Sequence, residues 1–284
     1  MTLAATAVGL APRSSRAAEG LVEVLVDAPI GEIAPEIHGH FVEHLGGVVY
    51  DGIWVGEHST IPNVGGIRKD LFHTMQQLTA PVVRWPGGCF ADSYNWRDGV
   101  GPRHKRPIRT DFLCNGPPLR SAPSGRQKSE PNTFGMCNVA QLVNCIHTPF
   151  LALEDHFAAT PDFHAFDMYK SHKGSQSLRF VSDPPTISFG PNKSYWRLAG
   201  SASLRGKALV ITVANSHVSE PRTAEDSLRG ASARFCIVTV LASADIHAHN
   251  EFENPRAVEP ERKPARITGS SFAWTLKPAN QARD

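Results

Sequence analysis

Short runs of β-forming residues, separated by turn residues, recur through the second half of the chain. They include Leu209–Val213, Phe235–Leu241 and Phe272–Leu276. Valine, isoleucine, threonine and aromatic residues favour strands, whereas the glycine, proline and asparagine between them favour turns. Regularly spaced short strands of this kind are typical of two antiparallel sheets packed face to face. The pattern therefore predicts a C-terminal antiparallel β-sandwich.

The first half of the chain has a different pattern. Leu21–Val26 alternates apolar and polar residues, as a half-buried strand does. His38–Tyr50 suits a buried strand that ends in a loop with polar groups, and Ile67–Leu78 has the apolar spacing of a helix. Val82–Trp85 then predicts a second short buried strand, before a sharp turn at Pro86–Gly88. A strand, a helix and another strand in this order form the repeating unit of α/β folds.

The middle of the chain separates these two patterns. Residues 99–133 are rich in proline, arginine, lysine and serine and show no periodicity. Asn138–Leu153 recovers a helix-like apolar spacing, and Phe163–His172 is a compact amphipathic piece. We therefore place the boundary between an α/β part and an all-β part near residues 160–180.

The composition limits the class of function. The chain has 284 residues, of which 41% are hydrophobic and 20% charged, and a formal net charge of +2. It can bury a core, but it has no overall field that would attract nucleic acid or a membrane surface. No apolar run approaches the ~20 residues that span a bilayer. Five cysteines at irregular spacing make a poor disulfide framework, which favours unpaired thiols.

The N-terminus leaves two interpretations open. Leu3–Ala11 is a short run of small apolar residues, followed by the Ala-rich stretch Ser15–Ala18. It is similar to the end of an export signal, but the basic region that should precede such a signal is absent. The alternative is a disordered Ala-rich tail. The first interpretation predicts a periplasmic or extracellular protein, and the second a cytoplasmic one.

Several blocks of the sequence resemble those of one enzyme family, in the same order. They are His38–Leu45, Arg84–Asp92, Tyr94–Arg103, Glu130–Gly135, Asn138–Asn144, Thr160–His172 and Ala248–Asn254. These blocks are similar to the α-L-arabinofuranosidases of glycoside hydrolase family 51, over about residues 21–280. The resemblance implies a (β/α)8 barrel followed by a jelly-roll-like β-sandwich.

The chain departs from that family in its centre. A (β/α)8 barrel takes roughly 250 residues, but only 133 residues run from Leu21 to Leu153. Neither catalytic glutamate of the family can be located, and the missing barrel segment maps near Gly135–Met136. We therefore expect a tail over residues 1–20, a partial (β/α)8-barrel remnant over residues 21–160 and a C-terminal antiparallel β-sandwich over residues 161–284. Leu21–Val26 is expected to join the sandwich.

The resemblance also implies residues that contact the sugar, although it supplies no catalytic residue. Glu43 matches a first-strand glutamate that accepts hydrogen bonds from the arabinose. The alternative interpretation of Glu43 is a solvated glutamate in a loop. Cys89 matches a residue lining the same subsite, or is a small buried hydrophobe in a tight turn. Gln141 matches a glutamine on the last barrel helix, or belongs to a polar helix face. Trp96 matches an aromatic residue beside the leaving-group side, or packs in an ordinary way.

Two further clusters favour simpler interpretations. His38, His40 and His44 would share one face of a strand, which raises the question of a zinc site, but they belong to the barrel-mouth block. We expect no metal there and no cofactor. A basic stretch lacks the interleaved aromatic residues of nucleic-acid binders and is interpreted as a solvated loop. It comprises Lys105, Arg106, Arg109, Arg120, Arg126 and Lys128.

Three hypotheses follow from the sequence. The first is an internally truncated α-L-arabinofuranosidase-type hydrolase, whose parent removes terminal arabinofuranosyl residues from arabinan or arabinoxylan with a retaining mechanism. Its partner would be an arabinofuranosyl-containing oligo- or polysaccharide, in a family that often forms homo-oligomers. The second is a non-catalytic carbohydrate-binding or assembly remnant. The third is a chain that does not fold stably.

Overall fold

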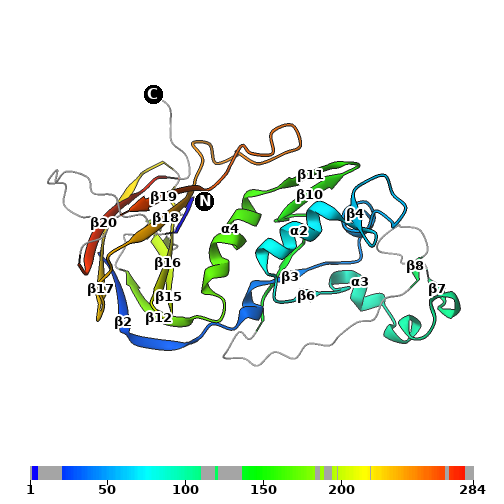
Figure 1. The fold of residues 1–284 in the computed structure, drawn as a ribbon, viewed down its shortest axis with the longest axis horizontal. Coiled ribbons are helices and arrows are strands. Elements are labelled where there is room, and N and C mark those ends of the chain that lie inside the picture. Colours follow the sequence, from blue (N-terminus) through cyan, green and yellow to red (C-terminus); the bar gives the residue numbers. More distant parts are fainter. Residues whose placement is uncertain are drawn as a thin grey trace. The chain divides into compact units, whose positions relative to one another are not determined.

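The computed structural model describes most of the chain. The described residues are 2–5, 21–109, 119–120, 136–182, 186–188, 194–196, 198–217, 219–265 and 269–278. They form two compact units. The β-rich unit comprises residues 1–33, 167–250 and 256–284, and the α/β unit comprises residues 34–166 and 251–255 (Figure 1).

The β-rich unit is built on one sheet of nine strands. Its order is β19-β18-β1-β16-β15-β12-β2-β17-β20. The strands are β1 (Thr2–Ala5), β2 (Leu21–Glu32), β12 (Gln176–Ser182), β15 (Leu198–Arg205), β16 (Ala208–Asn215), β17 (Arg222–Arg229), β18 (Cys236–Leu241), β19 (Glu261–Ala265) and β20 (Ser271–Leu276). A smaller two-stranded sheet pairs β13 (Thr186–Ser188) with β14 (Ser194–Trp196). The division into two facing sheets, as in a sandwich, stays a prediction.

The N-terminal strand β2 lies inside this sheet. It pairs antiparallel with β12 and parallel with β17, and a bulge near Leu178 bends its pairing with β12. Val22 and Val24 of β2 are almost completely buried and pack with Leu178, Leu198 and other apolar residues of the unit's core. The alternation seen in the sequence thus places one face of β2 against this core.

The first residues of the chain also form a strand. We expected a signal remnant or a disordered tail over residues 1–20, whereas Thr2–Ala5 forms β1, between β16 and β18. Residues 6–20, which include the Ala-rich stretch Ser15–Ala18, lie outside the described residues.

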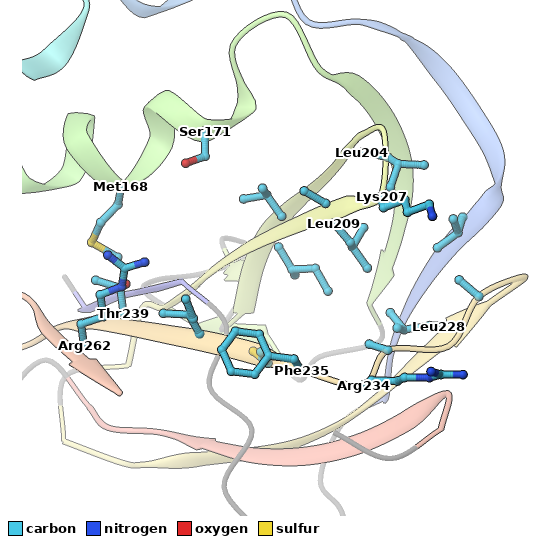
Figure 2. Close-up of a pocket in the computed structure, with 18 of the residues that line it drawn as sticks. Met168, Ser171, Leu204, Lys207, Leu209, Leu228, Arg234, Phe235, Thr239 and Arg262 are labelled. Atoms are coloured by element: carbon cyan, nitrogen blue, oxygen red, sulfur yellow. The ribbon is translucent and has the colours of Figure 1, made fainter. Parts of the chain in front are cut away.

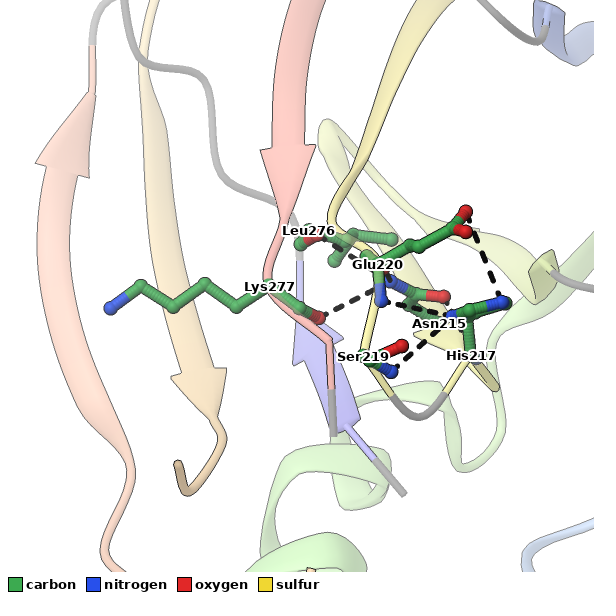
Figure 3. Close-up of polar contacts among 6 residues, drawn as sticks. All are labelled: Asn215, His217, Ser219, Glu220, Leu276 and Lys277. Carbon is green, nitrogen blue, oxygen red and sulfur yellow. Dashed lines mark hydrogen bonds and ion pairs between the residues drawn. The ribbon is translucent and has the colours of Figure 1, made fainter. Parts of the chain in front are cut away.

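Polar residues close a turn at one end of the β-rich unit. The Asn215 amide, which is fully buried, donates to the carbonyls of Glu220 and Lys277 at 3.1 and 3.3 Å. His217 Nδ1 accepts from the backbone N–H groups of Ser219 and Glu220 at 3.3 and 2.9 Å. Because Nδ1 accepts, the ring proton lies on Nε2, which faces the Glu220 carboxylate (Figure 3). The network ties the end of β16 to the start of β17 and the end of β20.

The α/β unit holds a parallel sheet of three strands in the order β6-β3-β9. β3 (Gly39–Phe41) lies in the middle, between β6 (Val83–Arg84) and β9 (Asn138–Ala140). A methyl group on Gly39 would come within 2.3 Å of Asn138 Oδ1, so a glycine allows β3 and β9 to approach. These three strands form an open sheet, in accordance with a partial barrel.

The described residues also form short helices and hairpins. The helices are η1 (Pro35–His38), α1 (Gly46–Val49), α2 (Lys69–Leu78), α3 (Gly88–Ser93), η2 (Trp96–Gly99), η3 (Arg103–Lys105), α4 (Pro161–Tyr169) and η4 (Lys170–His172); α4 crosses the boundary between the units, and η4 belongs to the β-rich unit. The hairpins pair β4 (Asn63–Val64) with β5 (Ile67–Arg68), β7 (Ile108–Arg109) with β8 (Leu119–Arg120), and β10 (Phe150–Leu153) with β11 (His156–Ala159). No helix among the described residues is long and apolar enough to cross a membrane.

Two sequence-based predictions for this unit are wrong. Asn138–Leu153 is not a helix, because it contains β9, an irregular stretch and β10. Asn144 and His147 take left-handed backbone angles (φ 53° and 56°), which a helix does not contain. Val83, predicted in a buried strand, is 43% exposed. β6 is an edge strand of a narrow sheet, so the sheet leaves it partly uncovered.

Candidate functional site

The candidate site lies where the three parallel strands end. Glu43 follows β3, Gln141 follows β9, and the turn Gly87–Gly88 follows β6. The carboxyl ends of parallel strands meet at one edge of their sheet, and ligands of α/β folds bind there. The register aligns Phe41 with both Arg84 and Ala140, so the residues that follow emerge together.

A buried carboxylate and a buried amide form the centre of the site. Gln141 Nε2 donates to Glu43 Oε2 at 2.8 Å, and the Glu43 backbone N–H donates to Gln141 Oε1 at 3.2 Å. The Phe90 backbone N–H donates to Glu43 Oε1 at 3.1 Å. Glu43 and Gln141 are 8% and 6% exposed. A carboxylate has about four acceptor positions, so each oxygen can accept a further hydroxyl donor.

Two glycines allow the turn to close over Glu43. Gly87 and Gly88 both have left-handed backbone angles, with φ of 55° and 59°. A methyl group on Gly88 would come within 2.1 Å of the Glu43 carboxyl carbon, and one on Gly87 would overlap the Phe41 ring. The Gly-Gly pair therefore serves both the backbone conformation and the close approach to the carboxylate.

Gly88→Ala should displace the Glu43 carboxylate and destabilise the turn that closes over it. Gly101→Ala is a matched control, because Gly101 also has a left-handed φ (89°) but has no atom within 4 Å of its added methyl group. Gly101→Ala should lower the free energy of unfolding by only about 1 kcal/mol, which is the cost of backbone strain at a left-handed residue. Gly88→Ala should cost more, and thermal or urea unfolding measures the difference. Equal destabilisation by the two substitutions would contradict the close-approach role of Gly88.

Cys89 and Trp96 occupy more exposed positions. Cys89 immediately precedes Phe90 and is exposed, not buried as in the alternative considered from the sequence. Trp96 is 50% exposed, and the Arg97 guanidinium lies 4.7 Å from its ring centre. Within the described residues, no contact joins Trp96 to Glu43 or Gln141. Cys89, Cys137, Cys145 and Cys236, which the structure describes, form no disulfide, and Cys114 lies outside the described residues.

The three histidines do not share one strand face. His38 ends η1, His40 lies on β3, and His44 lies beyond the end of β3, so the expected common face is wrong. His40 packs on the Phe166 ring at 4.6 Å between centroids. His44 stacks on Phe90 at 4.7 Å and its Nε2 lies 3.3 Å from the Tyr50 hydroxyl. The described residues contain no group of three or more metal-binding side chains.

Sequence reasoning missed Phe90 as a member of the site. Its backbone N–H holds Glu43 and its ring stacks on His44, so it links the carboxylate to the aromatic group around it. The position of Phe90 in the turn block Arg84–Asp92 was the available indication. Its role depends on a contact between residues 47 positions apart, which spacing does not reveal.

Other residues considered from the sequence lie elsewhere. Glu154 and Asp155 form the turn of the β10–β11 hairpin and are exposed. In the basic stretch, Arg106 Nε donates to the Gly101 carbonyl at 2.8 Å and Lys105 is exposed. Glu130, Arg126 and Lys128 lie outside the described residues.

Comparison with known proteins identifies the family. Residues 129–279 match the profile of the alpha-L-arabinofuranosidase C-terminal domain, which is more than half of the chain. The chain therefore belongs to the α-L-arabinofuranosidase family. An intracellular exo-alpha-L-arabinofuranosidase of Bacteroides ovatus is 51% identical over 141 residues, which cover 48% of this chain and 25% of that protein. An intracellular exo-alpha-(1->5)-L-arabinofuranosidase of Halalkalibacterium halodurans is 50% identical over 83 residues, which cover 29% of this chain and 16% of that protein.

Solved structures of arabinofuranosidases have a fold similar to that of this chain. The GH51 arabinofuranosidase from Xanthomonas axonopodis pv. citri aligns with a TM-score of 0.78 at 18% identity, covering 92% of this chain and 98% of that chain. The arabinose complex of the Thermotoga maritima α-L-arabinofuranosidase aligns with a TM-score of 0.75 at 16% identity, covering 92% and 98%. The chain spans a quarter or less of the length of the curated relatives named above. This partial coverage is consistent with an internally truncated chain.

Proposed function

We propose that this chain derives from a retaining α-L-arabinofuranosidase and keeps the part of the active site that orients the sugar. The buried Glu43 carboxylate carries the proposal. It is held by the Gln141 amide and the Phe90 backbone N–H, which are neutral donors. Burying a carboxylate without a cation is costly, and no ion pair to Glu43 occurs among the described residues. A sugar hydroxyl would supply a further hydrogen bond to this charge.

The ligand of this site is a terminal arabinofuranosyl residue of an oligo- or polysaccharide. The names of the relatives support this choice, since both curated relatives are named as exo-arabinofuranosidases. Gln141 would contact hydroxyls beside those held by Glu43, Cys89 would line the same subsite, and the exposed Trp96 ring would stack on the leaving-group side.

Hydrolysis requires more than this site offers. A retaining glycosidase places two carboxylates about 5 to 5.5 Å apart, one as acid and one as nucleophile. Glu43 orients a sugar in this proposal and supplies neither function. We therefore propose a chain that binds the sugar with negligible turnover. A non-catalytic carbohydrate-binding or assembly role of the chain is the second candidate, and the match of residues 129–279 to the C-terminal domain profile favours it.

Calorimetric titration with L-arabinose tests the binding. The wild-type chain should bind the sugar, and Glu43→Gln should weaken binding about 10- to 100-fold, because a hydrogen bond to a charge contributes about 1.5–3 kcal/mol. Glu154→Gln is the matched control, since this exposed glutamate lies in the hairpin turn and should leave binding unchanged. Equal binding by the wild-type and Glu43→Gln chains would refute the proposed site.

A further inference from the structure

The β-rich unit contains a cavity whose lining residues all belong to that unit. Its volume is about 1110 Å³, and residues of β15, β16, β17, β18 and the segment 231–235 line it. Leu204, Leu209, Ile211 and Leu228 contribute apolar side chains to the lining, as does Phe235. In the view of Figure 2, Leu204 and Leu209 lie above Phe235. The cavity extends the unit's apolar core, to which Ile211 and Leu228 belong. Ligand pockets are typically cavities of this kind, lined mostly by apolar side chains with a few polar or charged groups.

The mouth of the cavity exposes apolar surface. Phe235 is 64% exposed and Ile237 is 42% exposed, although both belong to the lining. Exposed aromatic and branched side chains around a cavity are a feature of binding sites. The neutral polar side chains in the lining are few and small, namely Ser171, Ser232 and Thr239. A sugar would require more hydrogen-bonding partners than these, so the lining suits an apolar ligand body.

Positive charge predominates at the edges of the cavity. The lining includes Lys170, Lys207, Arg234 and Arg262, against a single acidic residue, Asp167. Asp167 is already paired with Lys170 at 2.6 Å. For the side chains of Lys207, Arg234 and Arg262, no ion pair is found among the described residues. In the view of Figure 2, Lys207 and Arg234 lie toward one end of the cavity and Arg262 beside Met168 toward the other.

We infer that this cavity binds an amphipathic anion, whose apolar body lies between the aliphatic walls and whose carboxylate meets Lys207 and Arg234. Apolar burial supplies most of the affinity, in proportion to the area removed from water. The cations select for the negative head group. A long-chain carboxylate has this combination, whereas a neutral alcohol of the same length lacks the charge.

Titration of the full chain with dodecanoate, below its micelle concentration, tests the inference. We expect saturable binding of one molecule, several-fold tighter than that of dodecanol, and weaker binding as sodium chloride screens the exposed cations. Ala208→Trp, which places a ring at an exposed position of the lining, should reduce the binding of both ligands. Absence of saturable binding, or equal affinity for dodecanoate and dodecanol, would overturn the proposal.

Charge-matched variants separate the proposed contacts from a general effect of net charge. Lys207→Gln with Arg234→Gln should weaken dodecanoate binding about five- to tenfold and leave dodecanol binding unchanged. Arg229→Gln with Lys263→Gln removes the same charge from residues outside the lining, which are paired with Asp27 and Glu261. This control should change the affinity less than about twofold. Equal losses in the two double variants would contradict the assignment of the head group.

Discussion

The purified chain should hydrolyse 4-nitrophenyl α-L-arabinofuranoside at least about four orders of magnitude more slowly than an intact relative. The reason is that both the proton donor and the nucleophile of a retaining mechanism are absent from the site around Glu43 in our proposal. The Bacteroides ovatus enzyme, assayed in parallel, provides the reference. The release of 4-nitrophenolate, followed by absorbance over hours, measures the rate.

The Glu43→Gln chain is the control for this assay. A trace of contaminating enzyme would give the same residual rate in the wild-type and variant preparations. Turnover in the ordinary enzymatic range that disappears in Glu43→Gln would show that the catalytic pair is present and that Glu43 belongs to it or positions it. That outcome would contradict the proposal of binding with negligible turnover.

Arg68→Ala should destabilise the α/β unit by about 3–5 kcal/mol, which approaches the total stability of many domains. Arg68 is 1% exposed, and its guanidinium donates to the carbonyls of Asp51 and Glu154 at 2.6 and 2.9 Å, and to that of Gly52 at 3.3 Å. Burial lowers the pKa of the Arg68 guanidinium. Arginine side chains nevertheless stay protonated in proteins. Removing the side chain leaves these carbonyls without their donor and opens a cavity.

Lys69→Ala is the matched control for Arg68→Ala. Lys69 is the neighbouring basic residue, at the start of α2, and is exposed. Its removal should change the unfolding free energy by less than about 0.5 kcal/mol. Urea unfolding followed by tryptophan fluorescence measures both variants, because Trp54, Trp85 and Trp96 lie in this unit. A loss for Arg68→Ala no larger than that for Lys69→Ala would contradict the structural role of Arg68.

Local patterns in the sequence predicted the elements that local forces determine. Alternation located the strand that begins at Leu21, and apolar spacing located the helix that ends at Leu78. The same spacing misled us over Asn138–Leu153. There Leu142, Val143 and Phe150 are buried, yet Leu142 and Val143 lie in the irregular stretch after β9, and Phe150 begins the β10–β11 hairpin. Pro149 was the sequence feature that argued against a helix.

The candidate site was predictable only as a set of residue types. Glu43 and Gln141 are 98 positions apart, and their hydrogen bond depends on β3 and β9 being neighbours in the sheet. Spacing along the chain does not show that β3 and β9 are neighbours. The family resemblance, by contrast, assigned both Glu43 and Gln141 to contacts with the same sugar. The exposure of Val83 was not predictable, because a short apolar strand in a sequence does not show whether further strands cover it.

The central claim is that arabinose contacts the Glu43–Gln141 pair, and NMR spectra of the chain titrated with L-arabinose test it most directly. The side-chain amide signals of Gln141 and the backbone amide signal of Phe90 should shift together and saturate, because both groups bond to the Glu43 carboxylate. The side-chain amide of Gln76, exposed on α2, should not move. Gln141 and Phe90 signals that stay unchanged at saturating sugar would contradict the account.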